Sequence, residues 1–124
     1  MSLRPHILYV DDEENNLFAF KSVFRRSYNI ITASGGSEAI QVLEKEKVDL
    51  VLSDQRMPEM TGVDLCKYVM QNYPSAKRMI VTGYSDEETL KEAVLYGVIS
   101  KSISKPWEVE ELKREIDSAL QLDD

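Results

Sequence analysis

Three carboxylates and one amine stand where they could share one site. Asp11 and Asp12 follow the apolar run 6–10, Asp54 ends the apolar run 49–53, and Lys105 follows another short apolar stretch. If these runs are adjacent parallel strands, the acids meet at one sheet edge, where their charges repel each other unless a cation relieves them. A divalent metal ion and Lys105 are the obvious cations. This combination predicts a site that accepts a phosphoryl group.

The elements that must position these residues alternate along the chain. Apolar runs of strand length, rich in Ile, Val and Leu, are separated by segments of helical period, which is typical of βαβ units. We expect five helices and five strands, the strands near residues 6–10, 28–32, 49–53, 78–82 and 98–103. The predicted fold class is α/β, a single doubly wound five-stranded parallel sheet. Strand order 2-1-3-4-5 would bring the polar strand ends together, because right-handed crossovers put every carboxyl end on one edge.

The first and last helices each have a predicted core-facing side. Apolar residues recur there at steps of three and four, which indicates one buried face. These residues are Leu17, Phe20 and Phe24 in the first helix, and Val109, Leu112, Ile116 and Ala119 in the last. Gly35-Gly36, Thr61-Gly62 and Gly97 are predicted turns or caps. Gly35-Gly36 lacks a full glycine-rich fingerprint, which favours a cap over a phosphate cradle.

Composition limits the classes of protein to consider. The 124 residues fit one domain, expected over 1–124 with a core of about 5–121. Fifteen Lys and Arg against 22 Asp and Glu give a net charge of −7, which argues against direct nucleic-acid or anionic-membrane binding. The single cysteine, Cys66, excludes an internal disulfide and a cysteine-cluster metal site. No apolar stretch approaches the roughly 18 to 20 residues of a membrane span or forms a signal peptide, so we expect a cytoplasmic location.

Four motifs follow one another in a fixed order. They are Val10-Asp11-Asp12-Glu13, the segment 52–62 from Leu52-Ser53-Asp54 through Met57-Pro58 to Thr61-Gly62, Val81-Thr82-Gly83 and Ser104-Lys105-Pro106. Each motif alone is weak, but the four in this order and spacing are highly specific. Through them the chain resembles the receiver domains of two-component response regulators over essentially its whole length.

The resemblance implies a function and a set of roles. Asp54 would accept a phosphoryl group from a phosphohistidine on a sensor histidine kinase or phosphotransfer protein, and Mg²⁺ would be required. The implied metal ligands are Asp11, Asp12, Asp54 and the backbone carbonyl of Arg56, with Asp11 acting mostly through a water molecule. Phosphoryl contacts would come from Thr82, Gly83, Lys105 and the neighbourhood of Arg56, whose side chain we expect in solvent. The Lys105-Pro106 bond would be cis, against a base rate of about 5–6%.

The resemblance also implies a two-state surface. Phosphorylation would change the fourth helix, fifth strand and fifth helix, controlling an output domain or protein target and allowing a phosphorylation-dependent dimer. Ser102 departs from the family pattern, since receivers usually place Tyr or Phe three residues before the lysine. We therefore consider Tyr84 and Trp107, each near a phosphoryl-binding residue, as carriers of the signal. The alternative for Trp107 is that it only anchors the last helix by burying apolar area.

Simpler interpretations compete with this one. Asp11-Asp12 could be a helix cap, Asp54 a turn residue, Thr82 a strand-end hydroxyl and Lys105 a surface amine. A phosphatase of the haloacid dehalogenase type also uses an aspartyl nucleophile, but it needs a second Asp two residues later, where this chain has Arg56. A turnover enzyme is therefore not expected. The remaining alternative is a degenerate receiver kept as an unphosphorylated docking module.

Overall fold

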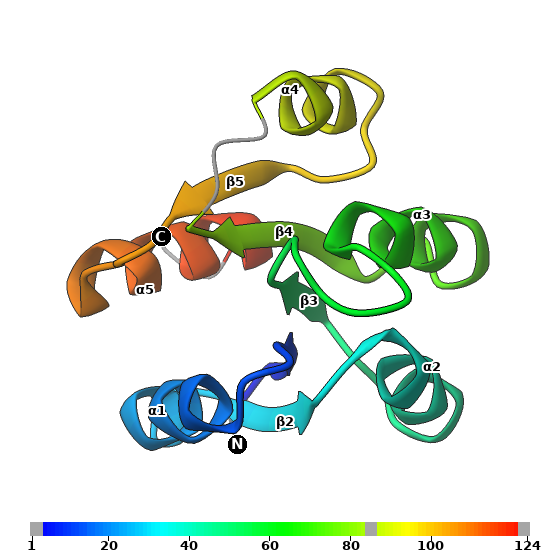
Figure 1. The fold of residues 1–124 in the computed structure, drawn as a ribbon. Helices are drawn as coiled ribbons and strands as arrows, with labels where there is room; N and C mark the ends of the chain where they lie inside the picture. Colours follow the sequence, from blue (N-terminus) through cyan, green and yellow to red (C-terminus); the bar gives the residue numbers. More distant parts are fainter. Residues whose placement is uncertain (1–3, 84–86, 122–124) are drawn as a thin grey trace.

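In the part of the chain that the structure describes, five strands alternate with five helices (Figure 1). The structure is a computed structural model and describes residues 4–83 and 87–121. The strands are β1 His6–Val10, β2 Asn29–Ala33, β3 Leu50–Ser53, β4 Lys77–Thr82 and β5 Lys101–Ser104. The helices are α1 Glu14–Phe24, α2 Gly36–Lys45, α3 Gly62–Asn72, α4 Glu87–Leu95 and α5 Val109–Leu120.

The sheet is parallel and has the predicted strand order, β2-β1-β3-β4-β5. Helices α1 and α5 cover one face, and α2, α3 and α4 cover the other (Figure 1). Alternate residues of β1 divide between the two layers, because successive strand side chains point to opposite faces. Ile7 and Tyr9 join the core beneath α1 and α5, whereas Leu8 and Val10 join the core beneath α2 and α3.

The predicted helix faces are buried with one exception. Phe20, Phe24, Leu112 and Ile116 are buried, and Leu17 and Ala119 pack against the same cluster. Burying a large apolar side chain contributes about 1.5–3 kcal/mol relative to leaving it in water, so this layer holds α1 and α5 to the sheet. The prediction for Val109 is wrong. Val109 is the first residue of α5 and stays 42% exposed, because it lies before the turn that reaches the core.

Strand β5 differs most from its predicted range of 98–103. Val98 and Ile99 are buried, as their apolar character suggested, but their amides donate to the carbonyl of Ala93 in α4. Those amides complete the end of a helix instead of a strand ladder, so β5 begins only at Lys101. The range of β1 is the predicted one, and the boundaries of β2, β3 and β4 differ from the prediction by at most one residue.

The predicted turn signals lie at helix ends. Thr61 caps α3, its side chain accepting from the Asp64 amide while the Asp64 carboxylate accepts from the Thr61 amide. Gly35 is the N-cap residue of α2, and Gly97 has a φ of 76°, a left-handed conformation that glycine adopts at low cost. Within the described residues, every helix is too short or too polar to cross a lipid bilayer.

Candidate functional site

Two of the acids are brought together by adjacent strands. Val10 of β1 pairs with Ser53 of β3, so the residues that follow them, Asp11 and Asp54, emerge side by side. The amide of Asp54 donates to the carbonyl of Val10 at 2.9 Å, which continues the ladder to the sheet edge. The backbone therefore determines the position of both carboxylates, as the strand pattern predicted.

The three acids form a compact cluster. One carboxylate oxygen from each of Asp11, Asp12 and Asp54 lies within 4.8 Å of the other two. Asp11 is fully buried, Asp54 is 9% exposed, and Asp12 is exposed. The cluster thus has a buried inner wall and one side open to solvent, from which an ion or a phosphoryl donor could approach.

Lys105 extends into this cluster from the end of β5. Its Nζ lies 3.0 Å from Oδ2 of Asp11 and 3.1 Å from Oδ2 of Asp54. Burial lowers the pKa of Lys105, but its hydrogen bonds and charge interactions with the two acids outweigh that effect, and the net pKa is raised above its usual range. The amine is therefore charged at neutral pH. The Lys105-Pro106 peptide bond is cis, which confirms that prediction.

Asp11 is held by a network that the sequence did not reveal. Its Oδ2 accepts hydrogen bonds from the Tyr9 hydroxyl at 3.3 Å and the Asn16 side-chain amide at 3.1 Å, in addition to Lys105. Its Oδ1 accepts from the Glu13 amide at 3.0 Å. Burial, then the charge and hydrogen bond of Asp11, raise the pKa of Tyr9, which keeps its hydroxyl a donor. The strand alternation marks Tyr9 as inward-facing, but nothing in the sequence marks Asn16.

The cap interpretation of Asp11-Asp12 does not describe this geometry. The N-cap residue of α1 is Glu13, which makes no side-chain cap hydrogen bond. Asp11 does accept the Glu13 amide, but its other oxygen is directed into the acid cluster and toward Lys105. Lys105 is likewise not a solvated surface amine, since its side chain is only 22% exposed.

The loop after Asp54 is fastened to α3 by Gln55, another residue that the sequence analysis missed. The Gln55 amide donates to Oδ1 of Asp54 at 2.7 Å, and its carbonyl accepts from the Gly62 amide at 2.9 Å. The buried side chain of Gln55 accepts from the Val63 amide at 2.9 Å through Oε1. Burial of a glutamine in a loop has no sequence signature, so only the structure identifies it.

Gly62 matters for a reason beyond the turn that was predicted there. A Cβ atom added at this residue would overlap the carbonyl oxygen of Asp54 and lie 2.7 Å from Cδ1 of Ile80. Since real Cβ atoms do not approach backbone so closely, the first turn of α3 can lie against Asp54 only if this residue is glycine. Arg56, in the same loop, has an exposed side chain, as predicted.

The residues that end β4 lie next to β5. Thr82 is 5% exposed and pairs with Ser104, while Gly83 is exposed. A Cβ at Gly83 would be 3.9 Å from Cβ of Lys105, so the Gly83 backbone lies close to the lysine that reaches the acids. Tyr84 lies outside the described residues.

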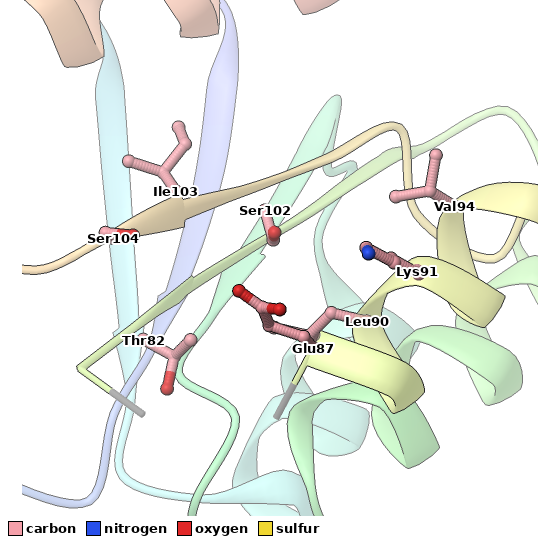
Figure 2. A pocket seen from close by; sticks show the side chains of 8 residues that line it. All are labelled: Thr82, Glu87, Leu90, Lys91, Val94, Ser102, Ile103 and Ser104. Atoms are coloured by element: carbon pink, nitrogen blue, oxygen red, sulfur yellow. The ribbon is translucent and has the colours of Figure 1, made fainter. Parts of the chain in front are cut away.

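The two remaining switch candidates occupy opposite sides of β5. Ser102 lines a cavity between α4 and β5 together with Thr82 (Figure 2). Trp107 packs against the aromatic residues of α1, with ring centroids 6.2 Å from Phe20 and 5.7 Å from Phe24. Trp107 also lines a second cavity with Lys105. It thus packs as an anchor would and also lies near the acid cluster.

The acid cluster fits a hard divalent cation. Carboxylate oxygens are the ligands that Mg²⁺ prefers, and three are present within 4.8 Å of one another. Asp12 is exposed and Asp54 partly so, whereas Asp11 is fully buried and its Oδ2 alone accepts from three donors. The donor set therefore suits a metal bound mainly through Asp12 and Asp54.

Comparison with known proteins gives consistent results. The family model of the response regulator receiver domain matches residues 7–117. The hydrogenase transcriptional regulatory protein HoxA of Bradyrhizobium diazoefficiens is 35% identical over 98% of this chain and 25% of its own length. The transcriptional regulatory protein GlrR of Escherichia coli K12 is 36% identical over 98% of this chain and 28% of its own. The chain thus spans about a quarter of the length of these relatives.

Solved structures agree with the sequence matches. The signal receiver domain of an HD domain-containing protein from Pseudomonas fluorescens is 34% identical, with a TM-score of 0.90 and 96% of both chains covered. The response regulator TrrA of Thermotoga maritima, solved in complex with Mg²⁺ and BeF, is 27% identical, with a TM-score of 0.82 over 94% of this chain and 99% of that one. The family match, the strand order and the sheet edge that carries Asp11, Asp12 and Asp54, which we call the acid edge, agree. The chain belongs to the response regulator receiver domain family.

Proposed function

We propose that Asp54 is the phosphoryl acceptor of this receiver domain. One observation carries the proposal: the Asp54 carboxylate lies in a cluster of three acids with the Lys105 amine 3.1 Å from it. A buried carboxylate beside two others repels further negative charge. A fixed amine, a metal ion and backbone donors can offset that repulsion.

The transfer would be an in-line displacement at phosphorus. A carboxylate oxygen of Asp54 forms the new O–P bond while the N–P bond to a histidine of the donor protein breaks. The electron pair of that bond stays on the imidazole nitrogen, which then takes up a proton. The product is an aspartyl phosphate, whose extra negative charge must be met by groups already in place.

Asp12, Asp54 and the backbone carbonyl of Arg56 would hold Mg²⁺, and Asp11 would contribute charge and bind a metal-bound water. This assignment is supported by the exposure of Asp12 and by the hydrogen bonds that already occupy both oxygens of Asp11. When bound, Mg²⁺ supplies fixed positive charge beside the acceptor carboxylate.

Lys105, Thr82 and Gly83 would bind the phosphoryl oxygens, with Arg56 bordering the approach from solvent. Lys105 is a point charge on a flexible stem, which suits an amine that must follow an arriving oxygen. The hydroxyl of Thr82 and the amide of Gly83 are at the end of the neighbouring strand. The openness of Gly83, where a Cβ would make only an ordinary contact, is consistent with close approach of the phosphoryl group.

A phosphatase with turnover remains disfavoured. The position two residues after Asp54 holds Arg56, which cannot serve as the second carboxylate that the haloacid dehalogenase mechanism needs. We therefore infer self-catalysed phosphoryl transfer and slow to moderate loss of the phosphoryl group instead of an enzyme acting on a free substrate.

The signal would pass to the surface of α4, β5 and α5. Lys105 links this surface to the acids because it directly follows β5. The donor would be a sensor histidine kinase or phosphotransfer protein, and the responder an output domain, a protein target or a second copy of the chain. We assign the domain to residues 1–124 with a core of about 5–121, and its location to the cytoplasm.

Mass spectrometry after incubation with acetyl phosphate and Mg²⁺ tests the proposal. The protein should gain one phosphoryl mass, and Asp54→Asn should lose that gain entirely because the nucleophilic carboxylate is gone. Asp64→Asn is the control, since Asp64 is an exposed acid that caps α3 and is not a member of the acid cluster. Equal labelling of Asp54→Asn and wild type would refute the assignment, and the absence of labelling in wild type would favour the docking module.

A further inference from the structure

A cavity between α4 and β5 lies beside Thr82 and has no role in the phosphoryl chemistry described above. Its volume is about 380 Å³, within the range of roughly 300–1,000 Å³ typical of binding pockets. One wall is a single stripe of α4, at steps of three and four. The lining residues are Thr82, Glu87, Leu90, Lys91, Val94, Ser102, Ile103 and Ser104 (Figure 2).

The cavity is open because the opposing wall is made of small side chains. Ser102 and Ser104 lie on the same side of β5, two residues apart, and neither can fill the space in front of α4. Leu90 and Val94 supply apolar surface, while the hydroxyls of Thr82 and Ser102 are polar groups within it. The Ile103 side chain packs against the core on the other face of the sheet. Figure 2 shows the Glu87 carboxylate extending from α4 toward the strand. An aromatic ring with a polar end would match this mixture.

Apolar surface continues from the cavity onto the outside of α4. Val94, which lines the cavity, is 43% exposed, and the next two residues, Leu95 and Tyr96, are 76% and 72% exposed. Val94 and Leu95 end α4 and Tyr96 follows it, so this end of the helix exposes apolar side chains that a partner could cover. The cavity and this strip together form one apolar surface, which we call the α4 surface.

The charges around the α4 surface are mainly acidic. Glu87, Glu88 and Glu92 are exposed on α4, against one exposed lysine, Lys91. The chain as a whole carries a net charge of −7. A partner segment with basic residues would be attracted to this helix, and an acidic one would be repelled.

We propose that the α4 surface binds a partner-protein segment in which one aromatic side chain, Trp or Tyr, is flanked by basic residues. The aromatic ring occupies the cavity in front of Ser102, its polar end faces Glu87 and the hydroxyls, and the basic residues meet the α4 glutamates. The inference rests on the proposed function, because it names the partner class of the surface that phosphorylation of Asp54 would change.

The experiment uses the full chain and a short synthetic peptide with one central Trp flanked by arginines. Binding is measured by the shifts of amide NMR signals during titration, with and without the beryllofluoride phosphoryl mimic. We expect shifts at Leu90, Val94, Ser102 and Ile103, and affinity that falls as salt is raised. Replacing the peptide Trp with Ala should weaken binding about tenfold or more.

Two protein variants connect the binding to this cavity. Ser102→Phe should abolish binding by filling the cavity from within, and Val94→Lys should weaken it by adding positive charge and removing apolar surface. Val23→Lys is the matched control, because Val23 is 42% exposed on α1 and lies far from the cavity. The Val94 variant keeps the test valid if Ser102→Phe does not fold.

Three results would overturn the inference. One is that the protein binds the Trp peptide and its Trp→Ala version with equal affinity. Another is that the Val94→Lys and Val23→Lys proteins bind the Trp peptide with equal affinity. The third is that the chain forms a dimer that Val94→Lys disrupts and that the peptide does not displace. In that case a second copy of the chain, and not a partner segment, would occupy the α4 surface. Acetyl phosphate labelling of Asp54 is read separately, so a chain that is labelled but does not bind the peptide refutes only this inference, while an unlabelled chain refutes the proposed function.

Discussion

The acid edge of the sheet and the face between α4 and β5 are built in opposite ways. At the acid edge, Asp11 alone accepts hydrogen bonds from four groups, and Asp54 is bonded to both Lys105 and the Gln55 amide. Between α4 and β5, small side chains leave a cavity of about 380 Å³ beside an exposed apolar strip. The acid edge is determined by many bonds within the chain, whereas the face between α4 and β5 contains open space.

The buried cores beneath these regions differ in the same way. Aromatic rings pack under the acid edge, with Tyr9 stacked on Phe20 at 4.1 Å and Phe20 tilted against Phe24 at 4.8 Å. The cluster beneath α4 contains smaller residues, including Cys66 and Ala93. Only Leu90 and Ala93 of α4 itself are buried. We therefore expect α4 to be the less stable side, and the following predictions test that difference.

The largest effect is expected at Gly62, on the acid edge. Gly62→Ala should destabilise the fold by about 1–3 kcal/mol, because the added methyl overlaps the Asp54 carbonyl and forces the backbone apart. Urea denaturation measures this loss, and acetyl phosphate labelling should slow in the same variant. Gly35→Ala is the control, since a Cβ there meets nothing within 4 Å and should cost only a few tenths of a kcal/mol. Equal losses at the two glycines would show that the acid edge is not tightly constrained.

The next prediction concerns pH and the core beneath α4. Burial raises the pKa of the Cys66 thiol from an ordinary value of 9.0 to about 12, although the charge of Arg78 opposes the shift. Since the unfolded thiol ionises first, the stability from this group is complete below pH 9 and is lost as pH rises toward 12. Between pH 9 and 10 this thiol alone should lower the free energy of unfolding by about 1 kcal/mol, and the raised pKa values of Tyr9 and Tyr28 add a smaller loss near pH 10.

Urea denaturation at several pH values measures that slope, and Cys66→Ala provides the comparison. The variant should be less stable at pH 7 because it leaves a small cavity, but between pH 9 and 10 it should lose about 1 kcal/mol less stability than the wild type. An identical slope in the variant and the wild type would mean that another group controls the alkaline loss of stability.

Filling the cavity should stabilise the α4 side. Ser102→Phe is expected to raise the free energy of unfolding by about 0.5–2 kcal/mol, because the ring buries apolar area in space that is now open. Ser102→Ala should change it by less than about 0.5 kcal/mol, since it leaves the cavity in place. The midpoint of urea denaturation distinguishes the two. Destabilisation by Phe would mean that the cavity cannot accept a ring, which would also weaken the case for an aromatic partner residue.

The smallest effect is spectroscopic. Trp107 lines a cavity with Lys105 and contacts the aromatic core, so movement of the lysine toward a phosphoryl oxygen should alter its fluorescence. Mg²⁺ with beryllofluoride should therefore change the emission of the wild type and leave that of Asp54→Asn unchanged. A silent Trp107 in the wild type would mean that the residue only anchors the start of α5.

The sequence predicted the fold and the positions of the acids because both follow from local patterns. Strand-length apolar runs separated by helical segments predicted a parallel sheet, in which residues at strand ends share an edge. The order that would bring the polar strand ends together is the observed one. Lys105 was found in the same way, and its distance of 3.1 Å from Asp54 agrees with that expectation. The range of β5 was wrong because apolar character alone cannot distinguish a buried strand from a buried helix end.

What the sequence determined by itself is therefore which residues could do chemistry and at which edge of the sheet they would meet. The tertiary structure alone decided which neighbours hold them and where space is left. Tyr9, Asn16 and Gln55 support the acids through hydrogen bonds between segments, and the cavity at Ser102 depends on how far α4 stands from β5. The strands and helices follow from short-range periodicity, but bonds and voids between distant segments depend on the packing of the whole chain.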